Sequence, residues 1–167
     1  MAVLCLLVFS QGIEALENMA MPRLHVEGRY LKDTHGNIVN LHGFAQTYSP
    51  WFNERGKYWT NYDVEGCLRY NKGLIDDILK AGWKMNFIRL HMDPYWSNVP
   101  GLPTTGESDI SAYSSVRFEK YLDLVFIPMA EYAVSKGLYV IMRPPGVCPE
   151  KIKVNDLYHK YLERVWK

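Results

Sequence analysis

The sequence predicts an α/β protein built from parallel βαβ units. Two helical segments, 71–83 and 116–136, are each followed almost at once by a strand, over 85–92 and 138–142. Helices and strands that alternate with such short connections are typical of parallel sheets. The loops that lead from strands into helices are instead long and rich in aromatic residues. A (β/α) barrel has this asymmetry, because its functional loops follow the carboxyl ends of its strands.

The N-terminal part predicts a hairpin that leads into the first strand of the sheet. Two alternating runs, 25–31 and 37–44, flank the turn-forming segment Lys-Asp-Thr-His-Gly-Asn. A long aromatic loop is expected over 45–70, and long loops in compact domains are often functional.

The two later helices are predicted from apolar spacing and from glycines at their ends. Gly82 and Gly137 supply the stops. We expect Pro128 to kink the second helix, because proline lacks an N–H and clashes with the preceding turn. A last helix is expected over 156–167. The apolar face of the second helix consists of Phe118, Leu122, Val125, Met129 and Ala133.

Length and composition indicate one globular domain without an electrostatic case for nucleic acid or a membrane. The chain has 167 residues, of which 48% are apolar and 22% charged, and its net charge is +1. We interpret residues 1–20 as a signal peptide or leader, because an apolar run too short to span a bilayer precedes small residues. This interpretation predicts a secreted or periplasmic protein whose mature part is 21–167.

The cysteines and glycines give no sign of a metal or nucleotide site. The cysteines do not form a metal-binding spacing, so we expect no metal. A disulfide between Cys67 and Cys148 is one interpretation, and two buried thiols is the one that we favour. No GxGxxG follows the first strand, and the chain has no P-loop, so we expect no nucleotide cofactor.

Three stretches in order resemble glycoside hydrolase family 5. They are LKDTHGNIVNLHGFA, LKAGWKMNFIRLHM and YAVSKGLYVIM. The similarity runs over about 24–167 and includes the characteristic Asn86 and Arg89. It implies a (β/α)8 barrel and retaining hydrolysis of β-1,4-glucan by a secreted, cellulase-like enzyme with a polysaccharide substrate and no cofactor. The chain would be a partial barrel, with the hairpin and about the first three βα units.

Two departures from that family pattern affect the expected activity. Strand three often ends in Asp-x-His in the family, whereas this chain has Arg143 followed by two prolines, as in some related β-galactosidases. Mannan and β-galactosides therefore stay open as substrates. The family's acid/base and nucleophilic glutamates are expected beyond Lys167, so we expect this chain alone, as a truncated N-terminal part, to be inactive. Glu54 follows an asparagine but lies in the first loop, and we interpret it as a solvated charge.

Strand alternation and loop position select the candidate site residues. Alternation directs Arg89 and His91 away from the helix layer, and a guanidinium there needs a carboxylate partner. The resemblance implies that Arg89 supports the nucleophilic glutamate, and a structural ion pair with Asp93 is the alternative. His42 and His91 are candidates for substrate hydroxyls. The aromatic candidates for stacking on sugar rings are Tyr48, Trp51, Trp59, Tyr95 and Trp96.

A function of another class is a half-barrel that binds carbohydrate without hydrolysis. Three strands of a barrel would expose two edges, so such a chain could associate with itself through them. Carbohydrate-binding modules are usually antiparallel sandwiches, and the βα alternation of this chain argues against one.

Overall fold

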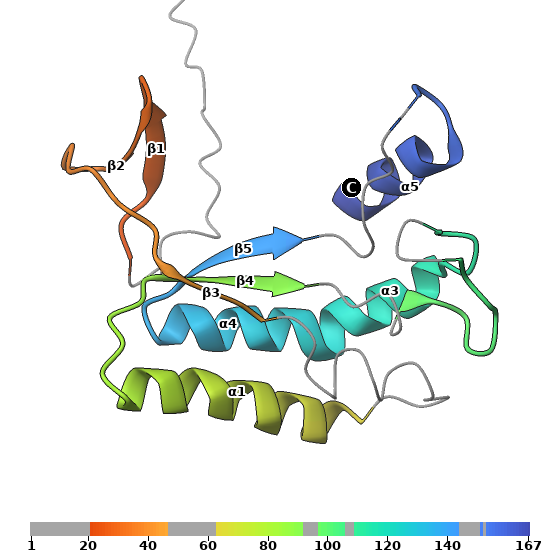
Figure 1. Ribbon diagram of the computed structural model, residues 1–167, viewed down its shortest axis with the longest axis horizontal. Helices are drawn as coiled ribbons and strands as arrows, with labels where there is room; N and C mark the ends of the chain where they lie inside the picture. The colour runs from red at the N-terminus through yellow and green to blue at the C-terminus, as the bar shows by residue number, and fades with distance from the viewer. Residues whose placement is uncertain (1–20, 47–62, 92–96, 106–108, 144–150, 152) are drawn as a thin grey trace, which may run out of the picture.

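A computed structural model describes residues 21–46, 63–91, 97–105, 109–143, 151 and 153–167 (Figure 1). The parallel sheet consists of β3 (Gly43–Gln46), β4 (Phe87–His91) and β5 (Tyr139–Arg143), with β4 in the middle. The described part thus has the α/β content and the parallel strands that the sequence predicts. These strands form an open sheet, so the partial (β/α)8 barrel stays a prediction.

One face of this sheet is covered by helices (Figure 1). They are α1 (Val64–Lys80), α3 (Ser115–Tyr121), the π-helical turn η4 (Leu122–Phe126) and α4 (Ile127–Ser135). A last helix, α5 (Leu157–Trp166), packs against the segment that precedes α3. The ring of Tyr161 lies edge to face with that of Tyr113, and the ring centroids are 4.9 Å apart. Arg164 of α5 also forms an exposed ion pair with Glu119 of α3 at 2.9 Å.

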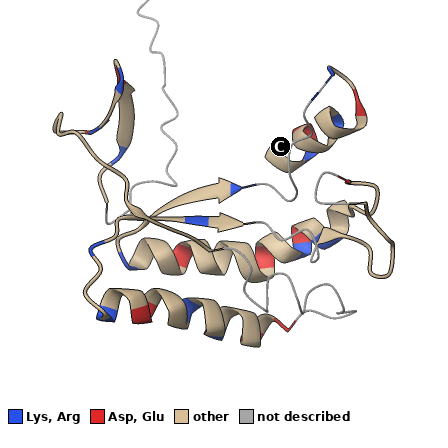
Figure 2. Cartoon of the chain, in the orientation of Figure 1, with Lys and Arg blue, Asp and Glu red and all other residues tan. Residues whose placement is uncertain are grey.

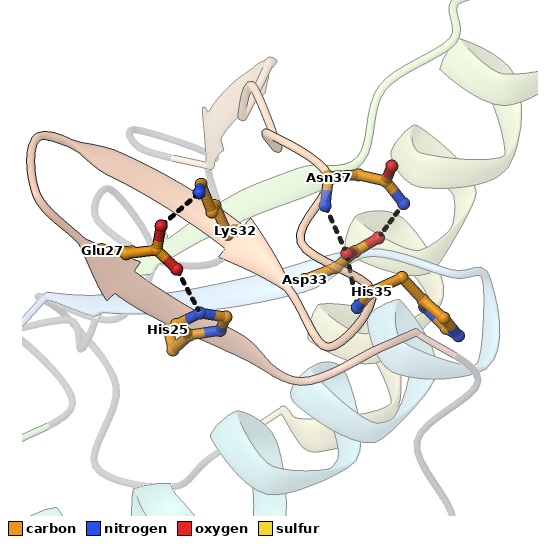
Figure 3. A network of polar contacts seen from close by, with 6 residues as sticks. All are labelled: His25, Glu27, Lys32, Asp33, His35 and Asn37. Atoms are coloured by element: carbon orange, nitrogen blue, oxygen red, sulfur yellow. Dashed lines mark hydrogen bonds and ion pairs between the residues drawn. The ribbon is translucent and has the colours of Figure 1, made fainter.

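The N-terminal hairpin is tighter than the sequence predicts. The run over 25–31 is two antiparallel strands, β1 (Leu24–Glu27) and β2 (Tyr30–Asp33), rather than one. Gly28 has a φ of +61°, which glycine adopts without strain, and it allows the reversal. Lys32 contacts the Glu27 carboxylate from the paired strand, and His25 contacts it from the same strand (Figure 3). The hairpin lies beside the amino ends of the sheet strands (Figure 1).

The turn predicted between the two alternating runs is confirmed, although it follows the β1–β2 hairpin, and a carboxylate organises it (Figure 3). Asp33 accepts hydrogen bonds from the backbone N–H of His35 at 2.8 Å and of Asn37 at 2.9 Å, and from the Asn37 amide at 2.9 Å. The Asn37 hydrogen bond is the main reason that the pKa of Asp33 is lowered. Gly36 occupies the left-handed position of the turn, with a φ of +83°.

Helix α1 begins seven residues before the expected position, at Val64 instead of residue 71. The Asp63 carboxylate caps it by accepting from the Gly66 N–H at 3.0 Å. A fully buried asparagine, Asn71, interrupts the apolar spacing, so this spacing did not predict the first turns of the helix. Its amide donates to the Cys67 carbonyl at 2.8 Å and accepts from Gln46 of β3, so this polar group is satisfied.

The kink expected at Pro128 stays a prediction, and the structure shows a π-helical turn, η4, just before this residue. Pro128 is the second residue of α4, which follows η4 without a break. The predicted apolar face is confirmed, since Val125, Met129 and Ala133 are fully buried, and Phe118 nearly so. Leu122 packs against the same core while partly exposed.

A glycine pair offers a test of how closely β3 and β4 approach. A Cβ built on Gly43 would lie 1.8 Å from the carbonyl oxygen of Phe87, whereas a Cβ on Gly73 of α1 meets no atom within 4 Å. We expect Gly43→Ala to lower the free energy of unfolding by about 1–3 kcal/mol, as overpacking does. Gly73→Ala should raise it by up to about 1 kcal/mol, because alanine favours helix. Urea midpoints measure both, and equal midpoints would contradict the close approach.

Candidate functional site

The candidate site lies on the face of the parallel sheet that points away from the helices. On β4, Ile88 and Leu90 are 0% and 1% exposed and belong to the core under the helices. Arg89 lies on the opposite face and is exposed, and its neighbour His91 on that face is partly buried. The alternation predicted for this strand is therefore confirmed.

The parallel register brings a third polar residue to the same place. His91 pairs with Arg143, and Arg89 pairs with Ala45 on one side and Ile141 on the other. Arg89, His91 and Arg143 thus share one sheet face at the carboxyl ends of two adjacent strands. In Figure 2 the charged bands on β4 and β5 are all blue, since neither strand contains an acidic residue. Here we call these three residues the Arg-His-Arg cluster.

Side-chain contacts join the cluster. Nη2 of Arg89 lies 3.2 Å from Nε2 of His91, and Nη1 of Arg143 lies 2.8 Å from Nδ1 of the same ring. The Tyr121 hydroxyl of α3 donates to the His91 carbonyl at 2.9 Å, which ties the end of β4 to the helix layer. The imidazole is therefore held between two guanidinium groups on an anchored strand end.

The surroundings of His91 keep its ring neutral. Burial is the main cause that lowers the pKa of His91 to about 4, and the charges of Arg143 and then Arg89 add to it. At neutral pH the cluster thus combines two positive charges with an uncharged imidazole. Within the described ranges no Asp or Glu forms an ion pair with Arg89. Such a group of donors can hold a carboxylate or another oxyanion.

His42 is not part of this cluster. Strand β3 is Gly43–Gln46, so only the end of the run predicted over 37–44 lies in a sheet strand, and His42 precedes the amino end of β3. Its Nε2 contacts the Lys84 carbonyl, and its backbone N–H donates to the Asn86 side chain at 2.8 Å. Asn86 also donates to the Asn40 carbonyl at 2.9 Å, so it joins the segments that enter β3 and β4. A contact of His42 with substrate stays a prediction.

Several predicted residues fall outside the part of the chain that the structure describes. They are Tyr48, Trp51, Glu54, Trp59, Asp93, Tyr95, Trp96 and Cys148. Their roles, and the alternative ion pair between Arg89 and Asp93, stay predictions. Cys67 is a fully buried residue of α1, and its pairing with Cys148 stays a prediction.

Arg143 is the site residue that the sequence analysis missed. It was noted there only as a departure from a family pattern. Its sequence signal is its place directly after the strand predicted over 138–142, but only the register with β4 shows that it meets His91. Among the described residues no three His, Cys, Asp or Glu side chains gather as metal ligands. The helices in those same ranges include none that is long and apolar enough to cross a membrane.

The depressed pKa of His91 predicts a pH dependence of stability. An unfolded chain binds a proton at His91 near pH 6.5, whereas the folded chain does so near pH 4. The unfolded state therefore binds more protons between these values, and the free energy of unfolding should fall as the pH falls from about 6.5 to about 4.

Arg143→Gln removes one of the charges that lower the pKa of His91, so this pKa should rise while staying below 6.5, because burial remains. NMR titration of the His91 ring measures it. Arg164→Gln is the matched control, since Arg164 pairs with Glu119 on another surface and should leave the pKa unchanged. A pKa of His91 near 6.5 in the unmodified protein would show that the ring is not held as described.

Comparison with known proteins identifies no relative of this chain. No family model, no curated protein and no solved structure matches the chain.

Proposed function

We propose that this chain is part of a retaining glycoside hydrolase of the family 5 type that acts on β-1,4-glucan. The observation that carries the proposal is the Arg-His-Arg cluster at the carboxyl ends of adjacent parallel strands, on the sheet face away from the helices. In (β/α) barrels this edge is where the active site lies. The proposed reaction, retaining hydrolysis, comes from the resemblance of the sequence to family 5. Mannan and β-galactosides are alternative substrates for the same reaction.

The exposed face of the sheet is an argument that a further layer of protein covers it. Parallel sheets are usually covered on both faces. Here one face packs on helices, while the other exposes Arg89 together with Ala45 and Ile141, the latter 38% exposed. The strands β3 and β5 each have one hydrogen-bonded neighbour among the described strands. Further strands that continue the sheet into a barrel would satisfy these edges and enclose the polar face.

The chemistry that the cluster would serve is the stabilisation of a carboxylate. Retaining hydrolysis needs two carboxyl groups about 5–5.5 Å apart, one as nucleophile and one as acid and then base. A guanidinium next to the nucleophile keeps it ionised at neutral pH. Arg89 is placed for this role, because it is exposed on the open face and forms no ion pair with a described acid. In this proposal the two glutamates belong to residues beyond Lys167, and carboxylates suffice for catalysis.

Hydrolysis assays test the proposal on the 167-residue chain and on the polypeptide that continues to the end of its reading frame. We expect the longer protein to release reducing sugar from β-1,4-glucan and the 167-residue chain to release none. Arg89→Ala in the longer protein should reduce turnover about 100-fold or more, the order that one lost contact to a developing charge costs. Arg164→Ala is the control and should leave turnover unchanged, since Arg164 lies in an exposed ion pair.

Two outcomes would reject the proposal. Normal turnover of Arg89→Ala would remove Arg89 from the reaction. Sugar release by the 167-residue chain would show that its own residues supply the catalytic carboxylates. Binding of cellulose by both proteins with no product from either would instead favour the binding-only function.

A further inference from the structure

A buried tyrosine of the helix layer holds the strand end that carries the candidate site. Tyr121 is 0% exposed, and its hydroxyl donates to the His91 carbonyl at 2.9 Å. His91 is the last residue of β4, and the pairing of β4 with β3 stops one residue earlier, at Gln46 and Leu90. The hydroxyl therefore fixes the end of β4 at a point where β3 no longer pairs with it.

The π-helical turn η4 is what directs Tyr121 into the core. The segments α3, η4 and α4 form one continuous helix, in which the Ile127 N–H donates to the Leu122 carbonyl, five residues back. An uninterrupted α-helix turns by about 100° per residue, which would place Ala133 about 120° around the axis from Tyr121. One extra residue in a turn sets the helix back by about 100° and leaves about 20°. Tyr121 and Ala133 are accordingly both 0% exposed.

We propose that Tyr121 is a positioning residue for the Arg-His-Arg cluster, and that the π-helical turn presents it to the end of β4. The hydroxyl reaches the strand from the helix layer, whereas the side chains of the cluster lie on the opposite face of the sheet. It acts on the main chain of His91 and so sets where the imidazole and its two guanidinium neighbours lie. This inference rests on the proposed function in one respect: there the cluster serves glycoside hydrolysis.

Removal of this one hydroxyl has a defined consequence. Phenylalanine at position 121 keeps the ring in the core, but the His91 carbonyl loses its donor. A main-chain carbonyl without a partner is costly beside a core, so the strand end has to shift towards another donor or water. The contacts that join the His91 ring to Arg89 at 3.2 Å and to Arg143 at 2.8 Å should shift with it.

NMR of the 167-residue chain tests this role without any activity. Tyr121→Phe should shift the side-chain signals of the Arg-His-Arg cluster. Tyr132→Phe is the matched control, because it removes a tyrosine hydroxyl from the same continuous helix. That hydroxyl donates to Asp76 at 2.6 Å, between α4 and α1, so its loss should leave the signals of the cluster unchanged.

Two results on this chain would overturn the proposal. One is a folded Tyr121→Phe chain whose cluster signals match those of the unmodified chain. The other is a Tyr121 hydroxyl proton that exchanges rapidly with water in the unmodified chain, where the hydrogen bond should slow this exchange. The second measurement decides the matter even if Tyr121→Phe fails to fold.

Kinetics of the longer protein test the effect on the reaction. Tyr121→Phe should lower kcat about ten- to a hundredfold with KM nearly unchanged, because a shift of about 1 Å costs rate without removing substrate contacts. Tyr132→Phe should leave kcat unchanged, and urea midpoints of both variants separate a loss of stability from a loss of rate. An unchanged kcat in Tyr121→Phe would overturn the role in the reaction. A longer protein without hydrolytic activity would reject the proposed function, and the NMR comparison would then decide the positioning role by itself.

Discussion

The alternation of side chains along β4 is the constraint on which the rest of the structure depends. Ile88 and Leu90 point into the core, and burial of each contributes about 1.5–3 kcal/mol. A shift of the strand by one residue would exchange them for Arg89 and His91, which would bury a guanidinium under the helices. The helix layer on one side and the polar face on the other follow from this one register.

The polar face acquires its chemistry from the pairing of β4 with β5. Because the strands are parallel, their carboxyl ends meet at one edge, and His91 comes to lie beside Arg143. Two fixed positive charges then surround a ring whose burial already disfavours a third. This positive edge suits negative charge, and the proposed carboxylate-dependent hydrolase would use it in that way.

Local signals in the sequence predicted much of the fold and only part of the site. The glycines at 82 and 137 marked the helix ends, and both adopt a positive φ there. The reversal at Gly28 was missed because this glycine sits inside a run that alternates, and the start of α1 was missed because Asn71 is a buried polar residue in an apolar stripe. Arg143 was missed because its contact with His91 depends on strand pairing, which no local pattern contains.

The central claim is that the polar face of this sheet is one wall of a catalytic barrel whose carboxylates lie further along the chain. Sequencing the coding region beyond Lys167 tests it most directly. The account predicts that the frame continues and that an Asn-Glu-Pro segment follows within about 30–50 residues, the length of one βαβ unit. A stop codon directly after Lys167, or a longer frame without that segment, would contradict it.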